Sequence, residues 1–174
     1  PAVSALIVLG THHEQQHQEL ILTDVLHMLS HHPGHPRYAP DTPTQPHESS
    51  ALTWRDYPAA LVETGHAGGA FAFDNESPRH RVYVESFALA SRPVNNGEFL
   101  AFIADGGYRR PELWLSEGWD WVGAHRAEAP LYWRQDSGAW AQFTLRGLRA
   151  LDLAAPVCHV SLYEADAYAR WAGA

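Results

Sequence analysis

The sequence contains one cysteine, one methionine and no lysine among its 174 residues. A single cysteine, Cys158, cannot form an intrachain disulfide, and this scarcity favours a reducing compartment, so we expect a cytoplasmic protein. The positive charges are twelve arginines against twenty acidic residues, which gives a net charge of −8. The sequence therefore shows no basic face or basic helix, which argues against nucleic-acid and membrane partners. No apolar run approaches the ~20 residues that span a bilayer.

Histidine is abundant, with twelve in the chain. Residues 11–30, THHEQQHQELILTDVLHMLS, have the pattern of one long helix, on which His13 and His17 share a face. Two imidazoles so spaced can share a transition-metal ion at roughly 2.0–2.2 Å, while His12 is expected to lie off that face. Apolar residues occupy most of the remaining surface, so we expect the helix to pack inside a bundle.

The same spacing recurs further along the chain, at His27/His31 and His31/His35. Both pairs run into the sequence His-His-Pro-Gly, where a helix must stop. This position predicts a frayed polar helix end rather than a metal site.

The letters HEQQH also match the zinc-peptidase motif H-E-x-x-H, in which Glu14 would act as the general base. That hypothesis needs a third zinc ligand, and the five prolines within residues 33–46 exclude a following helix that could carry one. A further possibility takes Glu14 and His17 as half of a di-iron carboxylate site. Glu63 and His66 have the letters of the other half, but we expect them to lie in a turn.

Three regions follow from the pattern: helical residues 1–32, a Pro-rich linker at residues 33–52, and a domain at residues 53–174. In the last region many short strands, few helices and many tryptophans predict an irregular α+β fold. Strands are expected at 60–63, 70–73, 80–84, 87–90, 131–134 and 140–145, helices at 96–104 and after a capping box at Ser161, and irregular structure at 108–130.

Both ends of the sequence look abrupt. The chain opens on Pro1 and enters an apolar helical stretch whose partner helices are absent from the sequence, and it stops just after a helix. We therefore expect a piece of a longer protein that is inactive by itself.

Four motifs together resemble the iron-dependent sulfoxide synthases of ergothioneine biosynthesis, which join a DinB-like four-helix bundle to a domain of the formylglycine-generating, sulfatase-modifying-factor type. HHEQQHQELILTD is similar to the bundle signature of that family. Three further stretches are similar to the signatures of the family's second domain: DNESPRHRVYVESFAL, RPVNNGEFLAFIADGGYRRPELWLSEGW and PVCHVSLYEADAYARWAG. One departure is Asn95, which stands where the family commonly has threonine.

The resemblance implies one helix of the bundle followed by an incomplete sulfatase-modifying-factor domain with a C-type-lectin-like fold. It implies Fe(2+) held by His13 and His17, with Gln16 beside the substrate. It carries no catalytic residue onto this chain, because the family's third histidine and its catalytic tyrosine fall outside it. The implied reaction joins the sulfur of cysteine or γ-glutamylcysteine to hercynine with O2; three imidazoles on one side of Fe(II) leave open positions for O2 and a thiolate.

Two other hypotheses stay open: a zinc peptidase, and a non-catalytic interaction module built on the lectin-like domain. Cys158 is expected to be a buried structural residue, since cysteine is among the most buried residue types. The tryptophans between residues 114 and 140 are expected to pack the core rather than form a cation–π cage. Arg109 and Arg110 are expected to be a surface pair.

Overall fold

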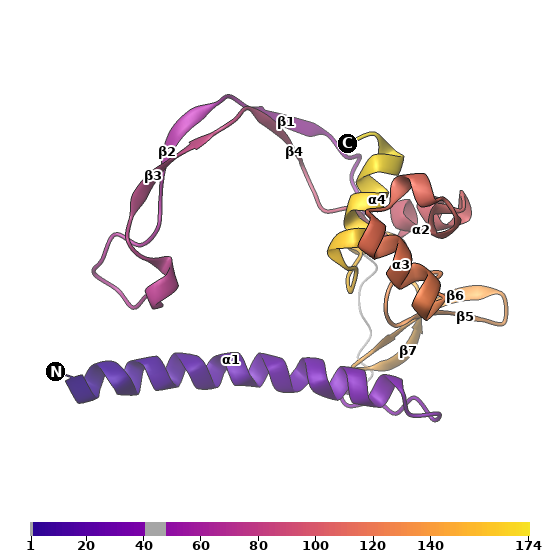
Figure 1. The fold of residues 1–174 in the computed structure, drawn as a ribbon. Coiled ribbons are helices and arrows are strands. Elements are labelled where there is room, and N and C mark those ends of the chain that lie inside the picture. Colours follow the sequence, from indigo (N-terminus) through magenta and orange to yellow (C-terminus); the bar gives the residue numbers. More distant parts are fainter. Residues whose placement is uncertain (1, 41–47) are drawn as a thin grey trace. The chain divides into compact units, whose positions relative to one another are not determined.

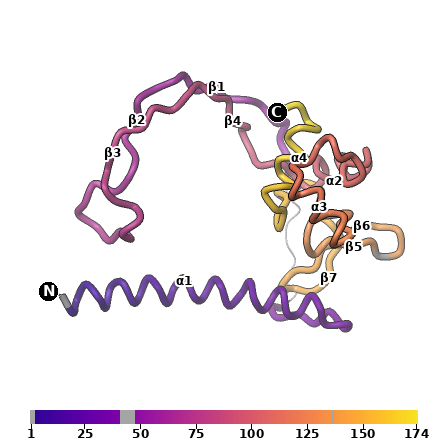
Figure 2. Tube along the Cα trace, viewed as in Figure 1, coloured from indigo at the N-terminus to yellow at the C-terminus, as the bar shows by residue number. Residues whose placement is uncertain are grey.

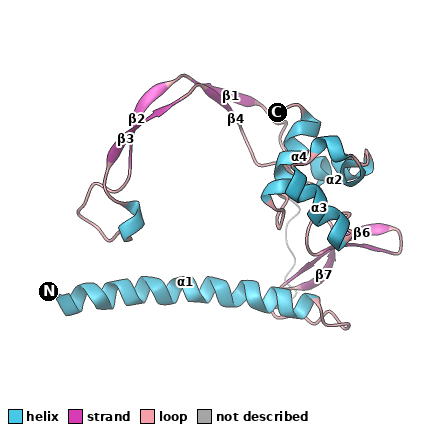
Figure 3. Cartoon of the chain, viewed as in Figure 1, coloured by secondary structure: helices cyan, strands magenta, loops and turns pink. Residues whose placement is uncertain are grey.

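The computed structural model describes residues 2–40 and 48–174; the remainder is the grey trace in Figure 2. The chain divides into two compact units. The first unit comprises Pro1–Asp24 and Leu52–Arg92, and the second comprises Val25–Ala51 and Pro93–Ala174. Helices and strands both occur (Figure 3), so the α+β class is confirmed. Part of the predicted linker lies outside the described residues, and the three-region division stays a prediction.

Helix α1, Ala2–Ser30, is one continuous helix (Figure 1). Gly10 does not interrupt it, and the helix stops two residues before the predicted end, at the turn preceding Pro33. Of its described side chains Leu26 alone is buried. The helix therefore exposes a row of large apolar side chains: Val3, Leu6, Ile7, Val8, Leu9, Leu20, Ile21, Leu22 and Met28.

Across residues 2–40 and 48–174, no helix combines the length and the apolar character that crossing a membrane requires.

The first unit contains two antiparallel strand pairs. Strand β1, Trp54–Tyr57, pairs with β4, Phe87–Ala90, and β2, Ala60–Thr64, pairs with β3, His80–Val84. In the β2–β3 register Val62 lies opposite Val82.

The expected strand at 70–73 is wrong, because β2 pairs with β3 instead. Gly68 and Gly69 have positive φ angles, which end any extended run before it. A loop with one short 3-10 helix, Asp74–Glu76, connects β2 to β3, and a 2.7 Å ion pair between Arg79 and Glu63 joins its two ends. Within the first unit, the Phe71 ring stacks on His12 of α1 at 3.9 Å.

The second unit contains helices α2 (Asn96–Ala104), α3 (Ser116–His125) and α4 (Leu162–Ala172) and a three-stranded antiparallel sheet. The strand order is β5 (Trp133–Asp136), β6 (Ala139–Thr144) and β7 (Gly147–Ala150). Aromatic and aliphatic side chains from the three helices, from β5 and from the segment between α2 and α3 form a buried core: Phe99, Phe102, Tyr108, Leu113, Trp114, Val122, Trp133 and Ala167.

The expectation that residues 108–130 are irregular is wrong in part, because α3 lies inside this segment. Its two glycines and two tryptophans obscure the helical pattern. Gly118 allows α3 to approach Tyr163 closely, because a Cβ at this position would lie 2.6 Å from Cβ of Tyr163. Strands β1 and β7 were also not predicted from the sequence.

Capping boxes begin two of these helices. The Asn95 side chain accepts a hydrogen bond from the Glu98 backbone N–H at 2.8 Å, and Ser161 caps α4 in the same way, as expected. Asparagine and threonine both serve at the N-cap position. The departure at Asn95 therefore conserves the local chemistry.

Gly107 should not tolerate a side chain. A Cβ there would lie 2.2 Å from Cε2 of Phe102, whose side chain is fully buried. We expect Gly107→Ala to lower the free energy of unfolding by about 3 kcal/mol, because overpacking displaces core side chains. Urea unfolding followed by tryptophan fluorescence measures the change.

Gly123→Ala is the matched control for this substitution. Gly123 lies inside α3, and a Cβ at this position would meet nothing within 4 Å. Alanine should raise the stability there by up to about 1 kcal/mol through its helix propensity. Equal effects of the two substitutions would contradict the packing explanation.

Candidate functional site

His13 and His17 converge on the exposed side of α1. Their Nε2 atoms are 2.9 Å apart, and the two rings are nearly perpendicular, with centroids 4.5 Å apart. The spacing of four residues brings the side chains together because it is close to one helical turn. The helix thus holds two ring nitrogens near one point in space.

This geometry fits a shared metal ion. Two nitrogens at roughly 2.1 Å from one ion, and about 90° apart as in an octahedral site, are about 3.0 Å from each other. The observed separation of 2.9 Å agrees with that requirement. Within the described part of the chain, no group of three His, Cys, Asp or Glu side chains is placed to hold a metal. His13 and His17 are therefore the two metal donors that the described residues bring together at this point.

The residues around the pair face other surroundings. His12 stacks on Phe71 and meets Phe73 edge-on at 6.5 Å, so its ring belongs to an aromatic contact inside the first unit. Glu14 and Gln16 are both exposed on α1. Gln16 lies three residues after His13, a spacing at which two side chains are neighbours on a helix surface.

The residues that would form the second half of a di-iron site, Glu63 and His66, do not lie on a helix. Glu63 lies on strand β2 and forms an ion pair with Arg79. His66 follows in the loop, where its backbone N–H donates to the Glu76 carbonyl at 2.7 Å. A di-iron bundle site needs its second Glu-x-x-His on a helix, and these residues are on a hairpin.

At the end of α1 two histidines make side-chain contacts that a frayed helix end would not keep, contrary to the expectation. His27 and His31 bring their Nε2 atoms to 3.2 Å, and His27 Nδ1 lies 3.2 Å from the Tyr132 hydroxyl. His35 does not join them, because its Nε2 accepts a hydrogen bond from Arg134 at 2.5 Å. Of the two later pairs predicted from the sequence, His27/His31 therefore brings its imidazoles together and His31/His35 does not.

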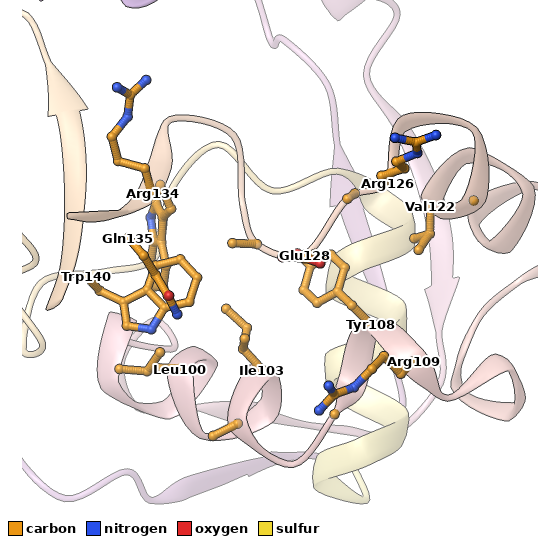
Figure 4. Close-up of a pocket in the computed structure, with 16 residues that line it drawn as sticks. Leu100, Ile103, Tyr108, Arg109, Val122, Arg126, Glu128, Arg134, Gln135 and Trp140 are labelled. Carbon is orange, nitrogen blue, oxygen red and sulfur yellow. The ribbon is translucent and has the colours of Figure 1, made fainter. Parts of the chain in front are cut away.

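A cavity of about 820 Å³ opens in the second unit (Figure 4). Leu100, Ile103 and Trp140 line its apolar part, and Figure 4 shows the guanidinium groups of its arginines spread around the margin. Charges dispersed in this way provide no single anion-binding point. The three arginines are Arg109, Arg126 and Arg134.

The tryptophans mostly pack the core, as expected. Trp114 is buried and donates from Nε1 to the Gly107 carbonyl at 2.8 Å, and Trp133 is buried as well. Arg110 forms ion pairs with Asp105 and Glu112, which agrees with its expected surface role.

A family model for the sulfatase-modifying factor enzyme 1-like domain matches residues 55–174. The chain belongs to this family. The match covers β1 through α4, so the domain includes the second half of the first unit and most of the second unit.

Among similar proteins is a hercynine oxygenase of Mycolicibacterium thermoresistibile, 36% identical over 169 residues, which cover 93% of this chain and 35% of that protein. A hercynine oxygenase of Mycobacterium tuberculosis is 41% identical over 103 residues, 59% of this chain and 24% of that protein. Ergothioneine biosynthesis protein 1 of Schizosaccharomyces pombe is 54% identical over 33 residues, 19% of this chain and 4% of that protein.

These relatives confirm the resemblance indicated by the motifs. The chain spans about a third of the first relative's length and less of the others. The assignment of α1 to a DinB-like bundle stays a prediction.

In this sulfatase-modifying-factor domain the expectation for Cys158 is wrong: the residue is exposed. Its Sγ lies 3.5 Å from the Pro156 carbonyl, in a loop before α4. Val157 and Val160, on either side of it, pack against the core instead. Its neighbour His159 is partly covered, and this burial lowers the pKa of its imidazole.

Proposed function

We propose that the protein is a non-haem iron enzyme that uses O2 to join a thiol sulfur to hercynine as a sulfoxide. The observation that carries this proposal is the similarity to a hercynine oxygenase along 93% of the chain. The converging Nε2 atoms of His13 and His17 support it, since imidazole suits Fe(II) and few protein ligands leave positions for substrates.

The reaction balances with O2 as the only oxidant. A C–H bond of hercynine and the S–H bond of cysteine or γ-glutamylcysteine are replaced by a C–S bond and an S=O bond. One oxygen atom of O2 enters the sulfoxide and the other leaves as water with the two hydrogens. Bound iron would supply the oxygen activation, as cofactors do in such reactions.

The residues of this chain would bind the metal ion and orient the substrate. His13 and His17 would hold the ion as neutral imidazoles, and Gln16, one residue before His17, would contact the bound substrate through its amide. No residue here is assigned a proton-transfer role. Because the sequence has a single cysteine, we also propose that the enzyme is cytoplasmic.

Gln16→Ala should separate substrate binding from metal binding. Because an amide is not a preferred ligand for Fe(II) among imidazoles, the complete protein should keep its iron. Turnover should fall or the KM for hercynine should rise about tenfold, as for the loss of one hydrogen bond to a charged group. Iron content by elemental analysis and sulfoxide formation by mass spectrometry provide the two readouts.

Glu14→Gln tests the function class. A zinc peptidase needs this carboxylate as general base and would lose nearly all of its activity. The proposed oxygenase should retain much of its thiol- and hercynine-dependent O2 uptake. Loss of O2 uptake with the iron still bound would count against the proposal, and absence of any bound metal in the complete protein would favour the interaction module.

A further inference from the structure

A second histidine pair lies at the C-terminal end of α1, within the second unit. His27 and His31 are one helical turn apart, and their rings meet nearly perpendicular with centroids 4.6 Å apart. Both side chains are exposed, so an ion from solution can reach them. Their Nε2 atoms face each other at 3.2 Å.

This separation is compatible with one shared ion. Two nitrogens at roughly 2.0–2.1 Å from a tetrahedral zinc ion are about 3.3 Å apart. The value for the His27/His31 pair is 3.2 Å, against 2.9 Å for His13/His17. Two neutral imidazoles at such a distance need either one proton or one cation between their nitrogens.

Tyr132 fixes the orientation of His27. Its hydroxyl lies 3.2 Å from Nδ1, on the side of the imidazole away from His31. A hydroxyl can accept a hydrogen bond from Nδ1–H, which leaves the Nε2 lone pair directed at the ion. Metal-bound histidines are commonly held in this way through their other ring nitrogen.

The backbone around Tyr132 is constrained to present this hydroxyl. Tyr132 has a φ angle of +71° and His159 one of +61°, values that bulky residues rarely adopt. The His159 ring packs edge-on against Tyr132 at 4.8 Å, and the Leu131 N–H donates to the His159 carbonyl at 3.3 Å. Strained backbone held by its surroundings often marks a functional position.

The end of the helix favours a cation here. The last carbonyl groups of α1 carry partial negative charge, which stabilises positive charge within the last turn. His27 lies in that turn and His31 directly follows it.

We propose that His27 and His31 form a second metal site that binds a zinc-type divalent ion through both Nε2 atoms, with Tyr132 as the positioning residue. Water completes the coordination. Through its contact with His27, Tyr132 would connect this site to the loop that precedes β5. This site does not depend on the proposed oxygenase activity.

The test removes the first pair and asks whether zinc still binds. In the complete protein carrying His13→Ala and His17→Ala, Zn²⁺ titrated against a chromophoric chelator should occupy a site that His27→Ala or His31→Ala abolishes. His125→Ala is the matched control, because His125 is an exposed helical histidine of the same unit whose Nδ1 contacts the Trp121 carbonyl rather than another histidine. It should leave the zinc affinity unchanged.

Tyr132→Phe should weaken zinc binding about tenfold, the lower range for loss of a partner of a ligating histidine. A purely structural role for Tyr132 would lower thermal stability equally with and without Zn²⁺. The proposal instead requires that Zn²⁺ raise the melting temperature less in Tyr132→Phe than in its parent. Zinc binding that persists in His27→Ala, or is absent from the double-alanine parent, would overturn it.

Discussion

His17→Ala should remove iron from the complete protein, and His13→Ala should do the same. The two Nε2 atoms converge to 2.9 Å, so each substitution takes away one of the two donors that the described residues provide. In the three-histidine site that the resemblance implies, the two remaining imidazoles cannot hold Fe(II) facially. Iron content should fall to background, and O2 uptake on addition of thiol and hercynine should disappear with it.

His12→Ala is the control beside this pair. The His12 ring stacks on Phe71 at 3.9 Å, so its loss should reduce stability by about 1 kcal/mol while iron stays bound. Iron measured by elemental analysis alongside thermal unfolding separates the two effects. If His12→Ala empties the site and His13→Ala leaves it full, the assigned pair is wrong.

Features set by local sequence were predictable. The spacing of His13 and His17 places them on one face of any helix, and the Ser161 capping box marks the start of α4 from four residues alone. The fold class and the family resemblance follow in the same way, from motifs within short stretches.

Features set by contacts between distant segments were not predictable. Strand β2 pairs with β3 and not with the nearer segment 70–73. Two glycines with positive φ angles precede that segment, and the ion pair between Arg79 and Glu63 joins β2 to the start of β3. The contact of His27 with Tyr132 joins positions 105 residues apart, and no local pattern signals it. A frayed end was therefore the natural expectation for His27 and His31.

Glu164→Ala should cause the largest loss of stability in the second unit. This carboxylate is 2% exposed and accepts two hydrogen bonds, from the Tyr108 hydroxyl at 2.5 Å and from the Ser161 backbone N–H at 2.6 Å. Alanine would leave both donors without this partner, at about 1–3 kcal/mol each. We expect the free energy of unfolding to fall by about 4 kcal/mol in urea titrations.

Glu164→Gln keeps the size of the side chain and one accepting oxygen. It should lose about half as much stability, because one donor keeps its partner without the help of the charge. Equal losses in the alanine and glutamine variants would show that the negative charge, rather than the two hydrogen bonds, holds this region together.

The same contact predicts a loss of stability in alkali. Burial, and then the negative charge of Glu164, raises the pKa of Tyr108 far above its ordinary value of about 10. A group whose pKa is raised by folding contributes stability that is complete below the unfolded pKa and declines as the pH rises above it. Unfolding free energy should therefore fall above about pH 10, where the unfolded chain releases the Tyr108 proton and the folded chain retains it. Tyr108→Phe should be less stable than the parent near neutral pH but should show a shallower decline between pH 10 and 11, because the titrating hydroxyl is gone. Parallel declines in the two proteins would assign the alkaline loss to other tyrosines.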